Sequence, residues 1–292
     1  MKISAFTFLR NASRLRFPFV ESIRSALPLV DEFVVALGPC DDDTEARLRG
    51  IDSPKIRIIP TRWNENFDGR GRVKGFIYGQ QKSIALFNCT GDWALYLEGD
   101  ELLHEDDLPA LRAAMLRHLD NPRVEALYFH FRHFYGNANT LASSPAWYRR
   151  EIRAVRNNIP IWGMKGLFFS VPTSYHHMRY PRAADSGATI YHYGWVRPEA
   201  QFNEKWRGTY HHWDSTRPFP EIRYDEIDPQ TLVPFTGTHP AAIRDWLPPS
   251  AGLFRANPNH RLTPRERKNR RLRWFENKLH LDLSRKHFTP LD

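Results

Sequence analysis

The first hundred residues alternate short apolar runs with segments of helical periodicity. The apolar runs, which predict strands, are Ile3 to Leu9, Phe33 to Leu37, Ile56 to Ile59 and Trp93 to Leu97. The segments with helical spacing are Arg14 to Leu27, Asp42 to Arg49 and Val73 to Asn88. Because strands that alternate with helices pair in parallel, this order predicts an α/β fold with a mostly parallel central sheet flanked by helices.

The pattern changes after an amphipathic helix expected over 106–119. The runs Ala126 to Phe134 and Trp147 to Val155 are rich in aromatic residues and predict strands, with further short strands over 167–171 and 189–193. Loops rich in Pro and His dominate from about 200 to 260. Thr263-Pro-Arg-Glu266 has the form of a helix capping box, and we expect a basic helix from there to about Arg285. We therefore predict a main domain over 1–200 and a loop-rich and basic helical extension over 201–292 packed on it.

The composition is that of a globular protein. Of the 292 residues, 41% are apolar and 26% are charged, which are ordinary fractions. With only Cys40 and Cys89, a disulfide scaffold is not expected and a reducing cytoplasm fits. The chain opens on fold-like sequence instead of a secretory signal, and no apolar run reaches the roughly 18 residues that span a bilayer. These features predict a cytoplasmic protein.

The formal net charge of +9 favours an anionic partner. Nucleotide phosphates, nucleic acid and an anionic membrane surface all meet that requirement. Part of the excess lies in the tail, where Arg and Lys alternate with large apolar residues: Leu272, Trp274, Phe275, Leu279 and Leu283. Two interpretations stay open for this tail: the helix docks its apolar side on the core, or residues 263–286 contact anionic lipids at the inner face of a membrane.

Three acidic residues follow the apolar run that ends at Leu97. Glu98, Asp100 and Glu101 are separated only by Gly99. Carboxylates beside a buried strand are costly unless a cation meets them, and Mg²⁺ or Mn²⁺ with a phosphorylated ligand is a common solution. Glu98 and Asp100 point to one side of an extended chain, and we expect Gly99 to leave room for a ligand. A surface turn with acidic residues is the alternative.

Four motifs together resemble those of a bacterial family 2-type glycosyltransferase with the Rossmann-like GT-A fold. They are Thr7-Phe-Leu-Arg-Asn11, Gly38-Pro-Cys-Asp-Asp-Asp-Thr44, Gly91-Asp-Trp through Glu98-Gly-Asp-Glu101, and His192-Tyr-Gly-Trp-Val-Arg197. The resemblance covers roughly residues 1–200. The stretch from Gly237-Thr-His-Pro240 to Trp246 is similar to C-terminal parts of some members of the family.

The resemblance implies an inverting transfer of a sugar from a nucleotide-sugar donor to an acceptor hydroxyl, assisted by Mn²⁺ or Mg²⁺. It implies a glycan or lipid-linked acceptor and a role in making a bacterial surface polysaccharide or lipopolysaccharide. The metal-binding Asp-x-Asp of the family falls on Glu98 and Asp100, with Glu as a departure at the first position. His192 is expected to complete the metal or diphosphate site. Tyr193 and Trp195 form either a stacking wall for a sugar or part of the core.

The resemblance also assigns the residues that bind the nucleotide. The nucleoside is expected beside Thr7, Arg10 and Asn11, together with one acid of a three-residue cluster that comprises Asp41, Asp42 and Asp43. Capping of the following helix is the alternative role for these aspartates. Lys82 lies near a family position that faces the diphosphate, and an ordinary exposed helix lysine is its alternative.

An inverting transfer needs a carboxylate base that accepts the proton of the acceptor hydroxyl. Glu151 and Asp185 precede His192 and are the candidates, with Asp214 as a more distant option. A salt bridge with a neighbouring arginine is the alternative role for Glu151. Asp185 is favoured because we expect the segment 181–187 to be a loop, where catalytic groups are common.

Other functions are less compatible with the residues. The pairs His176-His177 and His211-His212 do not predict a zinc site, because adjacent side chains point apart on a strand and no Cys lies at a suitable spacing. A nucleotidyltransferase acting on sugar phosphates would carry an early glycine-rich basic loop, whereas the first strand here continues into Leu9-Arg-Asn-Ala12. A basic nucleic-acid-binding protein is suggested by charge alone, and no recognition motif supports it, so no nucleic-acid partner is expected.

Overall fold

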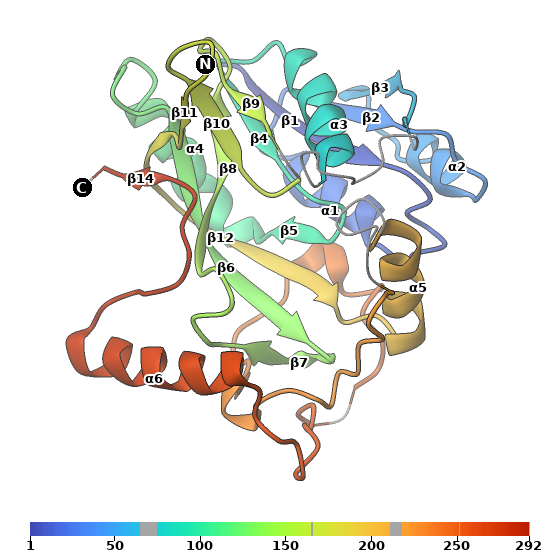
Figure 1. Cartoon of the computed structure of the whole chain (residues 1–292). Coiled ribbons are helices and arrows are strands. Elements are labelled where there is room, and N and C mark those ends of the chain that lie inside the picture. The colour runs from blue at the N-terminus through green and yellow to red at the C-terminus, as the bar shows by residue number, and fades with distance from the viewer. Residues whose placement is uncertain (65–74, 165, 211–217, 251, 292) are drawn as a thin grey trace.

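The computed structural model describes residues 1–64, 75–164, 166–210, 218–250 and 252–291. They form one large mixed sheet with helices on its faces, a small second sheet and a C-terminal helix at one side (Figure 1). The strands are β1 Ile3–Leu9, β2 Glu32–Leu37, β3 Ile56–Pro60, β4 Trp93–Tyr96, β5 Glu101–Leu103, β6 Ala126–Tyr135, β7 Asn137–Ala142, β8 Arg150–Arg156, β9 Trp162–Gly163, β10 Phe169–Pro172, β11 Met178–Arg179, β12 Arg182–Trp195, β13 Leu232–Pro234 and β14 Thr289–Pro290. The helices are α1 Phe19–Ala26, α2 Thr44–Arg49, α3 Phe76–Phe87, α4 Leu108–Arg117, α5 Glu199–Thr209 and α6 Pro264–Leu279, with short 3₁₀ turns at Glu105–Asp107, Pro229–Thr231 and Ala241–Ile243.

The N-terminal part of the large sheet is parallel. β1 pairs in parallel with β2 on one side and β4 on the other, and β2 pairs with β3. Alternate residues of these strands face opposite layers, so that Ile3 and Ala5 pack with α1 and α4, whereas Phe6 packs with α3. Both faces of the strands are therefore buried, which explains their nearly continuous apolar sequences. The expected α/β fold, with helices flanking a central sheet, is confirmed.

The second part of the large sheet is built differently. β8 lies between β4 and β6 and pairs antiparallel with both, while the long β12 pairs in parallel with β6 and antiparallel with β5. The expectation of a loop over 181–187 is wrong, because β12 starts at Arg182. This segment is held in an extended conformation because it pairs with β6 on one side and with β14 on the other. The register of its pairing with β6 shifts between Asp185 and Thr189, where Gly187 adopts φ of 68°.

Two helices differ from the prediction in length. The first begins at Phe19 and not at Arg14, because the residues before Pro18 turn back on themselves and Arg16 takes a positive φ of 50°. The capping box at Thr263 and Glu266 is confirmed, with both reciprocal bonds formed. The helix that it starts, α6, ends at Leu279, before the expected Arg285, because His280 adopts the left-handed conformation that terminates helices.

The C-terminal part of the chain contacts the sheet at several points. β13 pairs with β7 and β14 pairs with β12. Arg149, just before β8, makes two 2.7 Å bonds to Glu276 of α6, and Ile243 joins a buried cluster with Tyr191 and Tyr193 of β12. Among the described residues, no helix combines the length and the apolar character that crossing a bilayer requires.

A buried carboxylate fastens the start of β12 to the start of β6. Glu125 accepts bonds of 2.6–2.7 Å from the Arg179 guanidinium and of 2.9–3.0 Å from the Arg182 backbone and side chain. Burial alone would raise the pKa of Glu125, but these donors outweigh it and lower the pKa from 4.5 to about 2. The ionised carboxylate therefore stabilises the fold above the unfolded-state pKa, and this stability is lost as the pH falls from 4.5 towards 2.

Glu125→Gln should lower the free energy of unfolding by about 2 kcal/mol at pH 7, because charge-assisted bonds are lost. The difference from the wild type should shrink steadily between pH 4.5 and pH 2. Urea denaturation across this range measures it, with the exposed Glu221→Gln as control. A difference that is the same at every pH would contradict the assigned role of the ionised form.

Candidate active site

The centre of the candidate site is the carboxylate of Asp100. β4 ends at Tyr96, the chain turns through residues 98–100, and β5 then pairs with β12. This turn places Asp100, only 2% exposed, beside the C-terminal end of β12. Its Oδ2 accepts a 3.0 Å bond from Arg197 and lies 3.8 Å from the Lys205 ammonium of α5, while its Oδ1 lies 3.5 Å from Nε2 of His192.

A second histidine fixes the orientation of His192. Nε2 of the buried His133 lies 2.8 Å from the Tyr148 carbonyl oxygen, which can only accept a hydrogen bond, so this nitrogen carries a proton. Burial and then the neighbouring His192 lower the pKa of His133 to about 3, so the ring is neutral and its Nδ1 is an acceptor. His192 Nδ1, 2.9 Å away, must then be the donor. Nε2 of His192 is consequently the nitrogen that faces Asp100.

A separate ion pair lies next to this cluster. Glu101 and Arg153 are both fully buried and form two bonds of 2.5 and 2.7 Å. Glu98 lies 3.7 Å from the same guanidinium, and a third of its side chain is exposed. Burial and then repulsion from Glu101 raise the pKa of Glu98 to about 7. The acid at position 101 thus has a structural partner, whereas the carboxylate of Glu98 remains partly accessible.

The charges around Asp100 act on one another. Burial alone would raise the pKa of Asp100, but Lys205, His192 and Arg197 hold it well below its ordinary value. Burial and then Arg197 lower the pKa of Lys205 to about 8. For His192 the balance goes the other way: burial lowers the pKa, and the adjacent Asp100 raises it above 6.5 overall. Asp100 therefore stays ionised at neutral pH.

Asp100 and His192 have features of an incomplete metal site. None of the described residues donates a hydrogen bond to Asp100 Oδ1, although this atom is buried. Gly194 lies over the pair, and a Cβ at that position would come within 2.7 Å of His192 Nε2 and 3.1 Å of Asp100 Oδ2. The described residues contain no group of three or more His, Cys, Asp or Glu side chains that surrounds a cation. Asp100 Oδ1 and His192 Nε2 therefore fit a divalent ion that would take its other ligands from a bound phosphate and water.

Gly99 does not have the expected role. A Cβ on Gly99 would lie 3.3–3.5 Å from the side chains of Leu9, Phe17 and Phe19. This glycine therefore faces the apolar layer beneath the turn and not an open space for a ligand. The glycine that leaves room beside the acidic group is Gly194, in the motif His192 to Arg197.

The predicted nucleoside-binding residues gather where β1 and β2 end. Thr7 is buried in β1, and none of the described residues bonds to its hydroxyl. Asn11, with φ of 49°, accepts a 3.0 Å bond from the Asp41 backbone N–H, and the Arg10 guanidinium lies 5.4 Å from the centre of the Trp63 ring. This end of β1 therefore combines polar side chains with an aromatic face that sequence reasoning did not identify.

The three aspartates of the second motif have different surroundings. The exposed Asp41 pairs with Arg14 at 3.0 Å. Asp42 accepts bonds from the backbone N–H groups of Arg14 and Thr44, so it organises the start of α2. Asp43 occupies the N-cap position of α2, but its side chain makes no capping bond. Of the three, Asp42 is the most firmly engaged within the protein.

Lys82 has surroundings that neither sequence interpretation anticipated. It is fully buried, and its Nζ donates to the backbone carbonyls of Gly166 and Phe168 at 3.0 and 3.3 Å. The ammonium also lies 3.6 Å from the centre of the Phe169 ring, and burial lowers its pKa. The alternative of an exposed helix lysine is wrong, and a role at the diphosphate stays a prediction.

In the described part of the chain, neither candidate base makes a hydrogen bond or an ion pair with the residues that hold Asp100. Asp185 lies seven residues before His192 on β12, about 20 Å away along an extended strand, and accepts bonds from Tyr128 and Gly187. Glu151 is fully buried on β8, and its carboxylate lies 2.5 Å from Nδ1 of His287. Asp214 and the pair His211-His212 lie outside the described residues.

Sequence reasoning missed four charged or titratable residues at the site: His133, Arg153, Arg197 and Lys205. Arg197 ends the motif that starts at His192, so its position in that motif was the available signal. Lys205 comes from α5, in a region read as irregular, and no local pattern connects it with Asp100. His133 is recognisable only once β6 and β12 are paired, because His192 and His133 are register partners.

Comparisons with known proteins give partial similarities only. No family model matches the chain, and a search of the curated proteins finds no match. Among solved structures, S. aureus TarS 1-349 in complex with UDP-GlcNAc is 14% identical over 54% of this chain and 46% of that chain, with a TM-score of 0.35. Glucosyl-3-phosphoglycerate synthase from Mycobacterium tuberculosis, in complex with Mn²⁺, UDP and glucosyl-3-phosphoglycerate, is 22% identical over 46% and 44% of the two chains, with a TM-score of 0.31.

Mannosyl-3-phosphoglycerate synthase from Rubrobacter xylanophilus is similarly distant, with 23% identity over 46% of this chain and 41% of that chain and a TM-score of 0.31. The chain therefore spans less than half of the length of each of these structures. At this level of similarity, the activity has to be inferred from the chain's own residues.

Asp100→Asn should lower the pKa of His192 in the metal-free protein, because the negative charge that favours the imidazolium is removed. Histidine ring resonances followed by NMR across pH 4–9 measure this, with the exposed Asp52→Asn as control. An unchanged His192 pKa in Asp100→Asn would show that the two side chains do not interact as described.

Proposed function

We propose that the chain is a glycosyltransferase that moves a sugar from a nucleotide-sugar donor to an acceptor hydroxyl with inversion and with the help of a divalent metal. The observation that carries the proposal is the buried Asp100 carboxylate, whose Oδ1 and the Nε2 of His192 lie side by side while Arg197 and Lys205 hold its other oxygen. This group of charges lies beyond the C-terminal end of β4, next to β1, where open α/β sheets bind nucleotides.

Each residue has a distinct task in this proposal. Asp100 and His192 would hold the cation, Glu98 stays a predicted third ligand, and His133 keeps the Nε2 of His192 turned towards Asp100 by accepting the Nδ1 proton. A bound divalent cation stabilises the negative charge that develops on the departing diphosphate. Lys205, about a quarter exposed, lies on the open side of the cluster, where its ammonium can bind a phosphate oxygen.

The nucleoside part of the donor is proposed to lie where β1 and β2 end. β1 and the residues that follow it contribute Thr7, Arg10 and Asn11. The segment between β2 and α2 contributes Asp41 to Asp43. The exposed Asp41 and Asp43 are better placed to receive a ribose hydroxyl or base N–H than Asp42, which is engaged by two backbone donors. The base that accepts the proton of the acceptor hydroxyl stays a prediction at Asp185 or Glu151. The observed position of neither residue favours this role.

A nucleoside diphosphate should stabilise the protein in a metal-dependent way. With UDP at about 100 times its Kd in the presence of Mn²⁺, linkage gives about 2.7 kcal/mol, or a rise in Tm of about 5 °C. This rise should disappear without metal and in Asp100→Asn, and it should persist in Asp52→Asn. A thermal-shift series with UDP, GDP and other nucleoside diphosphates measures it. A rise that is independent of metal and survives in Asp100→Asn would contradict the proposal.

We further propose a glycan or lipid-linked acceptor, a role in surface glycan or lipopolysaccharide synthesis, and peripheral contact of α6 with an anionic membrane. The expectation that α6 docks its apolar side on the core is wrong for Trp274, Phe275 and Leu279, which are 55%, 47% and 56% exposed. Ion pairs hold the helix instead, such as Arg149 with Glu276. Exposed aromatic residues among exposed arginines and lysines suit the interface of an anionic bilayer.

The double substitution Trp274→Ala and Phe275→Ala should reduce co-sedimentation with phosphatidylserine-containing vesicles by at least threefold, because most of the apolar contact area is removed. The exposed Phe87→Ala on α3 is the matched control, since it removes an aromatic side chain from another helix. Equal sedimentation of the double variant and the wild type would rule out membrane contact through this face of α6.

A further inference from the structure

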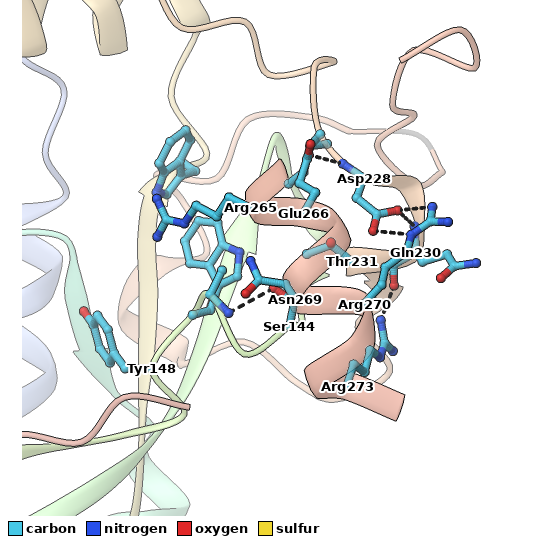
Figure 2. A pocket seen from close by; sticks show the side chains of 14 residues that line it. Ser144, Tyr148, Asp228, Gln230, Thr231, Arg265, Glu266, Asn269, Arg270 and Arg273 are labelled. Atoms are coloured by element: carbon cyan, nitrogen blue, oxygen red, sulfur yellow. Dashed lines mark hydrogen bonds and ion pairs between the residues drawn. The ribbon is translucent and has the colours of Figure 1, made fainter. Parts of the chain in front are cut away.

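A cavity separate from the Asp100 cluster lies between α6 and the end of β12. It has a volume of about 440 Å³, within the range that holds a sugar or a small cofactor. The chain before β8 and the end of β12 form one wall, and α6 forms the opposite wall (Figure 2). None of the functions assigned above to donor binding uses the residues of this cavity.

The first wall is aromatic. Trp147 and Trp195 both line the cavity, their ring centres are 5.6 Å apart, and each is only half-buried. Phe202 and Tyr135 both pack against Trp195, with ring centres 4.1 and 5.2 Å away. The C–H groups of a pyranose ring carry partial positive charge and pack well on the negative face of an aromatic ring. Two half-buried tryptophans that line one cavity are therefore a suitable surface for a sugar.

The opposite wall is polar and basic. Arg265, Asn269, Arg270 and Arg273 line the cavity from α6. Figure 2 shows Arg265 extending towards the side of Tyr148, whereas Arg270 and Arg273 extend towards Asp228 and Gln230. Arg270 is committed to Asp228 through two bonds of 2.6–2.7 Å. Within the part of the chain that the structure describes, Arg265 has no acidic partner and Asn269 makes no side-chain hydrogen bond.

The two acids in the cavity wall are already satisfied. Asp228 is bound by Arg270, and Glu266 accepts bonds from Thr263 and lies 3.0 Å from His260. Arg273 donates to the carbonyl of Gln230 and helps Arg270 to lower the pKa of Asp228, so three arginines of the cavity wall face two acids. The cavity therefore combines an aromatic platform with an excess of positive charge, and a guanidinium binds phosphate or carboxylate groups with two parallel hydrogen bonds.

The aromatic wall also contacts the candidate active site. The ring centres of Trp147 and His133 are 5.2 Å apart, and His133 bonds both to the Tyr148 carbonyl and to His192. The rings of Trp147 and His133 therefore lie between the cavity and His192, which faces Asp100. A ligand in it lies next to the predicted metal and diphosphate site without overlapping it.

We propose that this cavity binds a part of the acceptor that is remote from its reacting hydroxyl, and that this part is a saccharide that carries a phosphate or carboxylate group. The sugar ring rests on Trp147 and Trp195, and the anionic group binds Arg265 on the opposite wall. Asn269 supplies a side-chain amide for a sugar hydroxyl. This inference rests on the proposed glycosyl transfer and deepens it, because it names the chemical class of the second substrate.

The test measures direct binding of three probes, glucose 6-phosphate, glucuronate and glucose, to the chain of residues 1–292 by saturation-transfer NMR. The two anionic sugars should bind saturably, and uncharged glucose should bind at least tenfold more weakly. Arg265→Glu should weaken binding of both anionic sugars at least tenfold, because it replaces attraction by repulsion. Arg271→Glu, with the same charge change on α6 but outside the cavity, should alter binding less than twofold.

Stabilisation by UDP and binding of the anionic sugars, measured on the same variants, distinguish a failure of this inference from a failure of the proposed function. UDP with Mn²⁺ should stabilise Arg265→Glu as much as the wild type, because this residue does not touch the donor site. If UDP stabilises the protein but neither anionic sugar binds, or both bind Arg265→Glu as well as Arg271→Glu, the inference is wrong and glycosyl transfer stands. If the sugars bind as expected but UDP never stabilises the protein, the cavity is a sugar site and its assignment to an acceptor is wrong.

Discussion

The site depends on one buried charge, the carboxylate of Asp100. An isolated buried carboxylate is costly, and here Arg197, Lys205 and His192 each bring a positive or polar group to it. Arg197 itself is tied to the carbonyls of Gly194 and Leu15, so the cluster connects β12 with the segment before α1. Removing the carboxylate would leave a buried guanidinium without its counter-ion, which typically costs about 3–5 kcal/mol. The same interaction therefore holds the fold together and positions the candidate ligands.

The arrangement of the sheet explains why these groups meet. The parallel half, β3-β2-β1-β4, brings the ends of β1, β2 and β4 to one edge, as in other α/β folds. The second half adds β12, whose pairing with β5 places His192 opposite Glu101. The cavity beside α6 lies on the far side of Trp147 and His133 from His192 and Asp100. In the proposed reaction this cavity would hold a remote part of the acceptor, while the reacting hydroxyl would meet the donor sugar beside Asp100.

The sequence was sufficient for the parts that depend on local pattern. The strands around Ile3, Phe33 and Trp93 follow from apolar runs, and the start of α6 follows from the capping box at Thr263. Contacts between distant segments were not accessible in this way. The sequence predicts a loop over 181–187, whereas the structure has a strand from Arg182 because β12 pairs with β6, a contact between segments far apart in the chain.

The site shows the same division between local and distant information. The acidic residues after β4 stand out because they interrupt an apolar run, and Arg197 belongs to the motif of His192. Lys205 and His133 come from segments with no distinguishing pattern, and only the folded chain brings them to Asp100 and His192.

The most direct test of the assigned site is an anomalous diffraction map of crystals grown with Mn²⁺ and a nucleoside diphosphate. The account predicts a manganese peak within about 2.5 Å of Asp100 Oδ1 and His192 Nε2, in contact with the diphosphate; a bound nucleotide whose metal lies elsewhere, with Asp100 contacting only Arg197 and Lys205, would contradict it.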